Sequence, residues 1–117
     1  MELSTAVLGD VPMLVATGAI DHGTCSVLQA ELDRLFEARY NVIFLDFGNV
    51  AYIDSGGLSV LRAGVQALGH KGWLGLIGLN ADIRRLLEID GLLVDPRIRV
   101  FANTQAARIA TGERAST

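Results

Sequence analysis

Residues 42–58 read VIFLDFGNVAYIDSGGL, and this stretch decides the fold. It opens with a short continuous apolar run over residues 42–45, which is typical of a strand buried on both faces of a parallel sheet. Beyond Ser55 and two glycines, apolar residues recur at helical spacing up to Leu68. The stretch therefore predicts a buried strand, a connecting loop over residues 45–57 and a helix over about residues 57–68.

The residues upstream of this stretch predict a hairpin and a helix. Residues 3–8 and 13–20 have the apolar, β-branched character of strands, and the glycine–aspartate pair between them suits a tight turn. The spacing of the apolar residues then changes to a helical one, which predicts an amphipathic helix over residues 24–38 with Thr24 as its N-cap.

The downstream residues alternate between strand and helix patterns. Residues 73–79 are predicted to form a second buried strand, and Asn80 or Asp82 can cap a helix that Gly91 ends. A short strand over residues 98–101 and a helix over residues 104–110 follow. Strands that alternate with helices indicate an α/β fold. We expect a single domain with a mostly parallel mixed sheet, an antiparallel N-terminal edge strand and about four helices.

Composition excludes several classes of function. The 117 residues contain 10 basic and 13 acidic side chains, and Lys71 is the only lysine, so a nucleic-acid surface is not expected. One cysteine cannot form a disulfide within the chain. Neither a signal peptide nor an apolar membrane span is apparent, and we expect a cytoplasmic protein. Two histidines and one cysteine in separate segments indicate neither a metal site nor a cofactor.

The candidate site lies in two loops that follow strands. In open α/β sheets, functional residues gather at the carboxyl ends of the strands, which places residues 20–24 and 45–57 on one rim. We therefore expect Asp21, Asp54 and Ser55 in one patch. Ser55 can cap the following helix, and this is the plain interpretation of a serine at that position.

A functional interpretation of Ser55 is that its hydroxyl accepts a phosphate. Gly56 and Gly57 place no side chains beside it, so the active site of another protein can reach it. A phosphate would be favoured by the helix dipole and disfavoured by Asp54, and these effects roughly cancel on a solvated domain. They do not cancel beneath a bound partner, where an unpaired dianion is costly. Phosphorylation should then switch binding without unfolding the domain.

These motifs resemble the STAS domain family, the fold of bacterial anti-sigma factor antagonists and of the cytoplasmic tails of sulfate transporters. The central signature is matched by residues 42–58, the early turn by residues 17–21, the fourth strand by residues 72–78 and the third helix by residues 83–92. The resemblance implies a STAS domain over residues 1–110, followed by a frayed tail over residues 111–117.

The resemblance also implies a partner switch in a protein that is not an enzyme. The unphosphorylated antagonist binds an anti-sigma factor, which is usually also a serine kinase, and frees a sigma factor. The kinase phosphorylates Ser55, a serine phosphatase reverses this, and Asp21 helps to position the serine at the partner-binding rim with Asp54, Gly56 and Gly57. Many antagonists have Ser or Thr where this chain has Gly56.

Two alternatives remain open. A scaffold or lipid-transport-associated STAS subunit would use the same surface without phosphorylation. A hydrolase would use Ser55 as nucleophile and His22 as base. The nucleophile elbow Gly-x-Ser-x-Gly is incomplete here, because Ile53 stands where its first glycine belongs. The sequence leaves the oligomeric state open.

Overall fold

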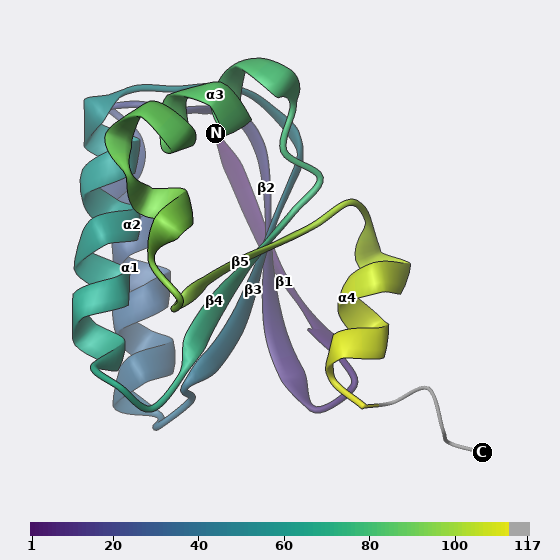
Figure 1. Cartoon of the computed structure of the whole chain (residues 1–117). Coiled ribbons are helices and arrows are strands. Elements are labelled where there is room, and N and C mark those ends of the chain that lie inside the picture. The colour runs from purple at the N-terminus through teal and green to yellow at the C-terminus, as the bar shows by residue number, and fades with distance from the viewer. Residues whose placement is uncertain (113–117) are drawn as a thin grey trace.

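The computed structural model describes residues 1–112, in which a five-stranded sheet carries helices on both faces (Figure 1). In chain order the elements are β1 (Glu2–Leu8), β2 (Val11–Ile20), α1 (Cys25–Glu37), β3 (Val42–Ile53), α2 (Ser55–Leu68), β4 (Trp73–Ile77), α3 (Ala81–Asp90), the 3-10 helix η1 (Leu92–Val94), β5 (Ile98–Phe101) and α4 (Thr104–Ala110). Most of the predicted frayed tail, residues 113–117, lies outside the described residues. Thr111 and Gly112 still make backbone hydrogen bonds to α4.

The strands are ordered β1-β2-β3-β4-β5 across the sheet. β1 pairs antiparallel with β2, and every other neighbouring pair is parallel. This confirms the predicted α/β class, the mixed sheet with an antiparallel N-terminal edge strand and the four helices. Because the parallel strands all run in one direction, the helices α1, α2 and α3 that follow β2, β3 and β4 begin at one rim, which is the upper end of the molecule in Figure 1.

The predicted loop over residues 45–57 is wrong, because β3 continues to Ile53. β2 extends to Ile20 and keeps pairing with β3 up to that point, so the backbone groups of this segment are satisfied in the sheet. The register shifts between Val15 and Thr17 and again between Gly18 and Ala19. Bulges of this kind break the strict alternation of buried and exposed residues, so the sequence of this segment lacks the alternating pattern by which a strand is recognised.

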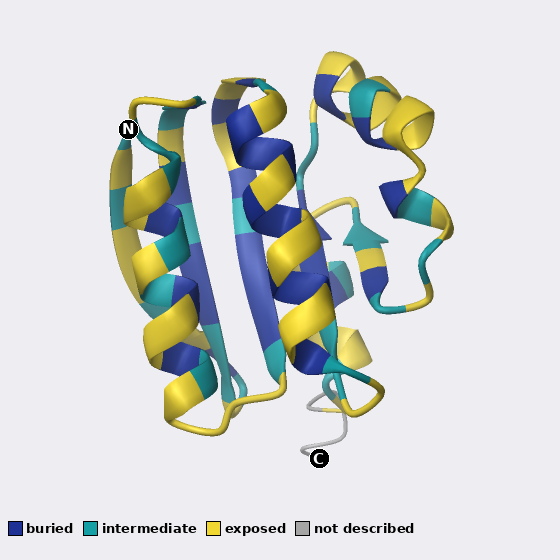
Figure 2. Ribbon diagram, turned by 90° about the vertical axis from the view of Figure 1, so that its left-hand side faces the viewer, coloured by how far each residue is buried: buried dark blue, intermediate teal, exposed yellow. Residues whose placement is uncertain are grey.

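The main core fills the space between one sheet face and the helices α1, α2 and α3. Figure 2 shows the buried faces of α1 and α2 turned towards the strands and their exposed faces turned to solvent. A smaller cluster lies on the opposite face, where α4 places Ala107 over it. There Phe44 packs edge-to-face on Trp73 and Phe101, with ring centroids 5.5 and 5.8 Å apart.

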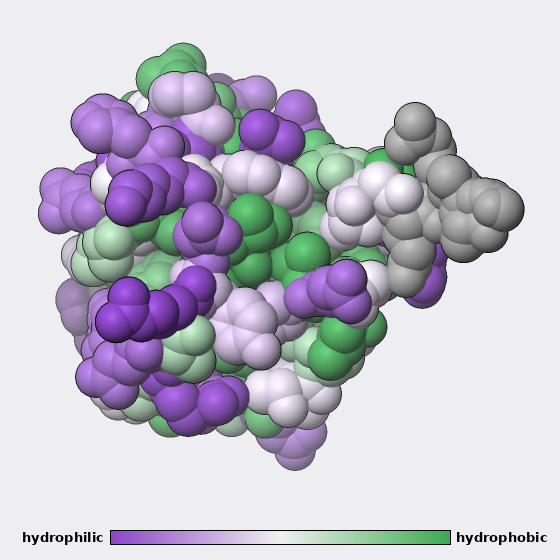
Figure 3. Space-filling view, turned by 90° about the horizontal axis from the view of Figure 1, so that it is seen from below, coloured by the Kyte–Doolittle hydropathy of each residue, from purple (hydrophilic) through white to green (hydrophobic). Residues whose placement is uncertain are grey.

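The end of the molecule opposite to the rim has both hydrophilic and apolar surface. Figure 3 views the end opposite to the rim at which α1, α2 and α3 begin. Hydrophilic residues cover the side of α1 and α2, and apolar surface is visible between these helices and α4. The rim itself rests on the main core, because Ile20 and Ile53 are both buried and are register partners in neighbouring strands.

Gly57 shows how closely α2 approaches this support. A Cβ atom added to Gly57 would lie 2.8 Å from Cδ1 of Ile53 and 3.0 Å from Cγ2 of Ile20. These distances are too short for carbon atoms in contact. Glycine at this position therefore allows the first turn of α2 to sit directly on the ends of β2 and β3.

We predict that Gly57→Ala destabilises the protein by about 1–3 kcal/mol through overpacking, although alanine has the higher helix propensity. Urea unfolding followed by circular dichroism measures this change. Gln66→Ala, on the exposed face of the same helix, is the matched control and should change stability by less than about 0.5 kcal/mol. A stabilised Gly57→Ala variant would contradict the close approach.

Candidate functional site

Two turns meet where β2 and β3 end. The backbone N–H of Asp54 donates to the carbonyl of Ile20 at 3.1 Å, which continues the pairing of the two strands by one residue. The backbone N–H of His22 donates to Oδ2 of Asp54 at 3.3 Å. These two contacts join the turn before α1 to the start of α2.

Asp54, and not Ser55, is the N-cap of α2. Oδ1 of Asp54 accepts hydrogen bonds from the backbone N–H of Gly56 at 2.7 Å and of Gly57 at 3.4 Å. Aspartate is as good an N-cap as serine, and the extended backbone of Asp54 suits that position. The predicted cap role of Ser55 is therefore wrong. Ser55 is the first residue of the helix, and its hydroxyl does not satisfy the helix end.

The Ser55 side chain is exposed and contacts the other turn. Its Oγ lies 3.1 Å from Nε2 of His22, within hydrogen-bond distance. The contact joins residues 33 positions apart in the sequence. Sequence reasoning considered His22 only as the base of a hydrolase. The signal that would have found this contact is the register of β2 and β3, since each residue lies two positions beyond the paired Ile20 and Ile53.

Gly56 leaves the space in which the His22 ring lies. A Cβ atom on residue 56 would be 3.1 Å from Nδ1 of His22 and 3.2 Å from its Cα. These separations are tighter than ordinary van der Waals contacts. The contact between His22 and Ser55 therefore depends on the absence of a side chain at position 56.

The carboxyl group of Asp54 is held in its charged form. Its partial removal from water raises the pKa, but the backbone N–H groups of Gly56, His22 and Gly57 act in the opposite direction, helped by the charge on the His22 ring. The net effect lowers the pKa of Asp54 below the ordinary value for aspartate. A negative charge therefore stands beside Ser55 at neutral pH.

Asp21 shapes its own turn. Its Oδ1 accepts from the backbone N–H groups of Gly23 and Thr24 and lies near the Thr24 hydroxyl, each at 3.0 Å. Thr24 stands at the N-cap position of α1, but its side chain makes no capping hydrogen bond. Its Oγ1 donates instead to the carbonyl of Ala19 at 2.9 Å. The predicted capping role of Thr24 is therefore wrong, and both side chains hold the turn that presents His22.

The predicted site residues thus lie on one rim with different exposure. Gly56 and Gly57 are buried, Asp21 and Asp54 are half-buried, and Ser55 and His22 are exposed. Whatever approaches this rim therefore meets the side chains of Ser55 and His22 first. The glycines support that surface from below.

The geometry supplies a serine–histidine pair but not a hydrolytic triad. Within residues 1–112, no carboxylate is hydrogen-bonded to Nδ1 of His22, whereas a triad needs one to orient the base. The N–H groups of Gly56 and Gly57 could form an oxyanion hole, but Oδ1 of Asp54 occupies them. The described part of the chain also contains no cluster of three or more metal-ligating side chains. None of its helices combines the length and apolarity that crossing a membrane requires.

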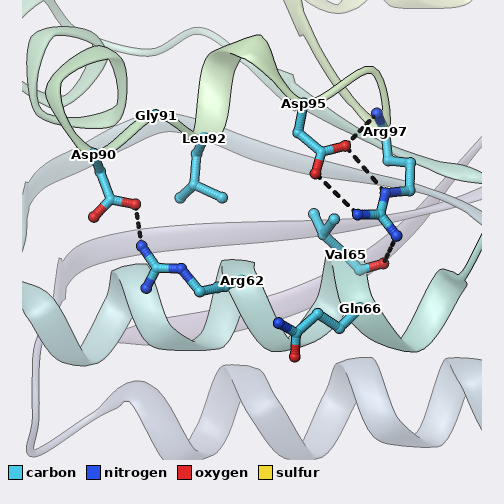
Figure 4. Close-up of a pocket in the computed structure, with 8 residues that line it drawn as sticks. All are labelled: Arg62, Val65, Gln66, Asp90, Gly91, Leu92, Asp95 and Arg97. Carbon is cyan, nitrogen blue, oxygen red and sulfur yellow. Dashed lines mark hydrogen bonds and ion pairs between the residues drawn. The ribbon is translucent and has the colours of Figure 1, made fainter.

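A concavity of about 170 Å³ lies away from the rim, between α2 and the segment from the end of α3 to β5 (Figure 4). Its charges are paired within the protein. Arg62 forms an ion pair with Asp90, and Arg97 donates two hydrogen bonds of 3.0 Å to the Asp95 carboxylate. Hydrogen bonding to Arg97 lowers the pKa of the Asp95 carboxyl.

Arg97 also donates to the carbonyls of Val65 and Gly69, at 3.2 and 3.0 Å, near the C-terminal end of α2. Such carbonyls have no partner inside the helix. The side chains around this concavity therefore hold α2 against the start of β5. None of these residues belongs to the rim.

Comparisons with known proteins agree on one family. The model of a family described as "Mlab, STAS domain" matches residues 3–94. An anti-sigma F factor antagonist of Paenibacillus polymyxa is 28% identical over 78 residues, which are 65% of this chain and 67% of the relative.

Solved structures show the same fold. An anti-sigma factor antagonist from Mycobacterium paratuberculosis is 21% identical with a TM-score of 0.82, covering 93% of this chain and 92% of that one. The Bacillus cell fate determinant SpoIIAA in its phosphorylated form is 16% identical with a TM-score of 0.71, covering 93% and 99%.

We predict that the Asp54 carboxylate stabilises the fold in a pH-dependent way. Because folding lowers its pKa, its contribution is fully present above about pH 4 and is lost as the pH falls through the lowered value. Asp54→Asn keeps a capping side chain without the charge. The difference in unfolding free energy between the wild type and this variant should be present at pH 5 to 6 and shrink at more acidic pH.

Thermal or urea unfolding at a series of pH values measures this difference. Asp10→Asn, in the exposed turn between β1 and β2, controls for the change in net charge. A difference that grows on acidification would show that the carboxylate destabilises the folded state.

Proposed function

Because this chain belongs to the STAS domain family, we propose that it is an anti-sigma factor antagonist of the cytoplasm. In its unphosphorylated form it binds an anti-sigma factor, and a sigma factor is released. Phosphorylation of Ser55 ends this binding. The observation that carries the proposal is the exposed Ser55 hydroxyl, which lies on the rim and is not used to cap α2.

The curated relative supports the choice of function, since it is named an anti-sigma F factor antagonist. The position of Ser55 supports the choice of residue. It directly follows Asp54 at the start of α2, and its side chain is exposed. The proposed kinase is the anti-sigma factor itself, and a serine phosphatase restores the free hydroxyl.

The chemistry at Ser55 is phosphoryl transfer from ATP. The bond between Oγ and the γ-phosphorus forms, the bond between that phosphorus and the bridging oxygen of ADP breaks, and the hydroxyl proton is released to water. The chain contributes an acceptor and no catalytic machinery. This agrees with the rim geometry, in which the nearby helix N–H groups are already bonded to Asp54.

The effect of the phosphate follows from the same geometry. The N–H groups of Gly56 and Gly57 are occupied by Asp54, so the phosphate gains little from the helix end. It stands as a dianion beside a carboxylate that is held charged. On the free domain, water solvates both groups. A partner that covers the rim removes that water, and the net negative charge then opposes binding.

Two observations favour a second candidate, a scaffold or lipid-transport-associated STAS subunit that is not phosphorylated. The matching family model is described as "Mlab, STAS domain", and Gly56 replaces the hydroxyl residue of many antagonists. Such a subunit would use the same rim for a permanent complex. The two candidates differ in whether a negative charge at residue 55 disrupts the complex.

We predict that a cognate anti-sigma factor with serine kinase activity transfers phosphate from ATP to Ser55. Mass spectrometry of the product should place the phosphate on Ser55, and Ser55→Ala should remove it. Ser59→Ala is the matched control, because Ser59 is also exposed and lies one turn further along α2, with its Oγ donating to the carbonyl of Ser55.

Ser55→Asp should weaken binding to that anti-sigma factor by at least about tenfold, because a charge is placed beneath the partner. Calorimetry or surface plasmon resonance measures this change, and Ser59→Asp is the comparison. Absence of phosphate on Ser55 together with undiminished binding by Ser55→Asp would contradict the proposed switch and favour the permanent complex.

A further inference from the structure

His22 is the titratable base that contacts Ser55. Its Nε2 lies 3.1 Å from Oγ, and both side chains are exposed. We infer that His22 is the built-in counter-ion of phosphorylated Ser55, taking up a proton and pairing with the phosphate. This inference rests on the proposed phosphorylation of Ser55 and adds a residue that regulates its consequence.

The backbone holds His22 in place before any phosphate arrives. Its N–H donates to Oδ2 of Asp54, and its carbonyl lies 3.8 Å from Sγ of Cys25 at the start of α1. The Asp21 carboxylate holds the turn by accepting hydrogen bonds from the backbone N–H groups of the two residues that follow His22, and Gly56 leaves room for the ring. A phosphate on Oγ would thus be attached at an atom that the imidazole already contacts.

Phosphorylation changes what Oγ offers to His22. The free hydroxyl can donate its hydrogen to a neutral Nε2 or accept one from it. When the phosphoryl group replaces that hydrogen, only acceptor oxygens remain, and Nε2 must be the donor. The proton that leaves Oγ is matched by one proton bound at the imidazole, so the product is a phosphate dianion beside an imidazolium. Ion pairs with this charge-assisted geometry are the stronger kind.

The other groups around His22 make a cation there favourable. Asp54 contacts its backbone, Asp21 precedes it, and the Cys25 thiol lies on the side of α1. On the neighbouring helices, the arginines that form ion pairs do so with carboxylates other than Asp21 and Asp54. Arg34 binds Glu31 on α1, Arg62 of α2 binds Asp90, and Arg84 binds Glu88 on α3. The phosphate would join two carboxylates, and His22 is the residue in contact that can offset the added charge.

This role makes the switch sensitive to pH in the range where imidazoles titrate. With His22 protonated, the rim of the phosphorylated protein carries one negative charge less. A partner is then repelled less strongly than when the ring is neutral. As the pH falls from mildly alkaline values towards 6, the off-state should therefore weaken more in the wild type than in His22→Gln, in which only the phosphate titrates.

The test uses the full chain with phosphoserine placed at position 55 during translation, so no kinase is required. Ring ¹⁵N chemical shifts at pH 7 should show His22 converted to imidazolium in the phosphorylated protein. His70 is the internal control, because it lies in the turn beyond the other end of α2, and it should be unchanged. An equal response of the two histidines, or none at His22, would overturn the inference.

A second measurement follows the phosphate itself. In ³¹P titrations, the second ionisation of the phosphoserine should occur at a pH lower by about 0.5 unit in the wild type than in His22→Gln, because a nearby cation favours the dianion. His70→Gln should behave as the wild type. His22 is exposed, so glutamine replaces it without disturbing the core and keeps a hydrogen-bonding group.

Identical ³¹P titration curves for the wild type and His22→Gln would refute the counter-ion role. Because the phosphate is introduced directly, this result is independent of whether a kinase modifies Ser55. If the kinase failed to phosphorylate Ser55, the proposed function would be contradicted. The titration of the prepared phosphoprotein would still test the counter-ion role of His22.

Discussion

The parallel pairing of β2 with β3, as far as Ile20 and Ile53, is the constraint on which the rest of the site depends. The two strands end level with each other, and the bond from the Asp54 N–H to the Ile20 carbonyl carries the pairing one residue beyond them. The turns that leave the strands are therefore held against each other. Had the register differed by one residue, the side chains leaving one strand would point to the opposite face.

Asp54 combines two tasks that serine could not perform together. As the N-cap of α2 it uses Oδ1 for the helix N–H groups, and as the joint between the turns it uses Oδ2 for His22. This releases the Ser55 hydroxyl from structural duty. A phosphate added to that hydroxyl would remove no cap from α2, so a change of charge there can alter binding while the fold persists.

The small residues at the start of α2 support this arrangement in different ways. Gly57 lets the helix rest on the buried ends of the strands, and Gly56 leaves space for the His22 ring. A histidine from the neighbouring turn, His22, lies beside Ser55, so residues from two separate segments surround the serine.

The sequence by itself determined the order of strands and helices, the mixed α/β sheet and the location of Ser55 at a helix start. These follow from hydrophobic periodicity and from residues that begin or end helices, which are local signals. Only the tertiary structure decided that β3 continues to Ile53, that Asp54 caps α2 and that His22 meets Ser55 across 33 residues. Those outcomes depend on the register of two strands, which bulges shift and which no local pattern records.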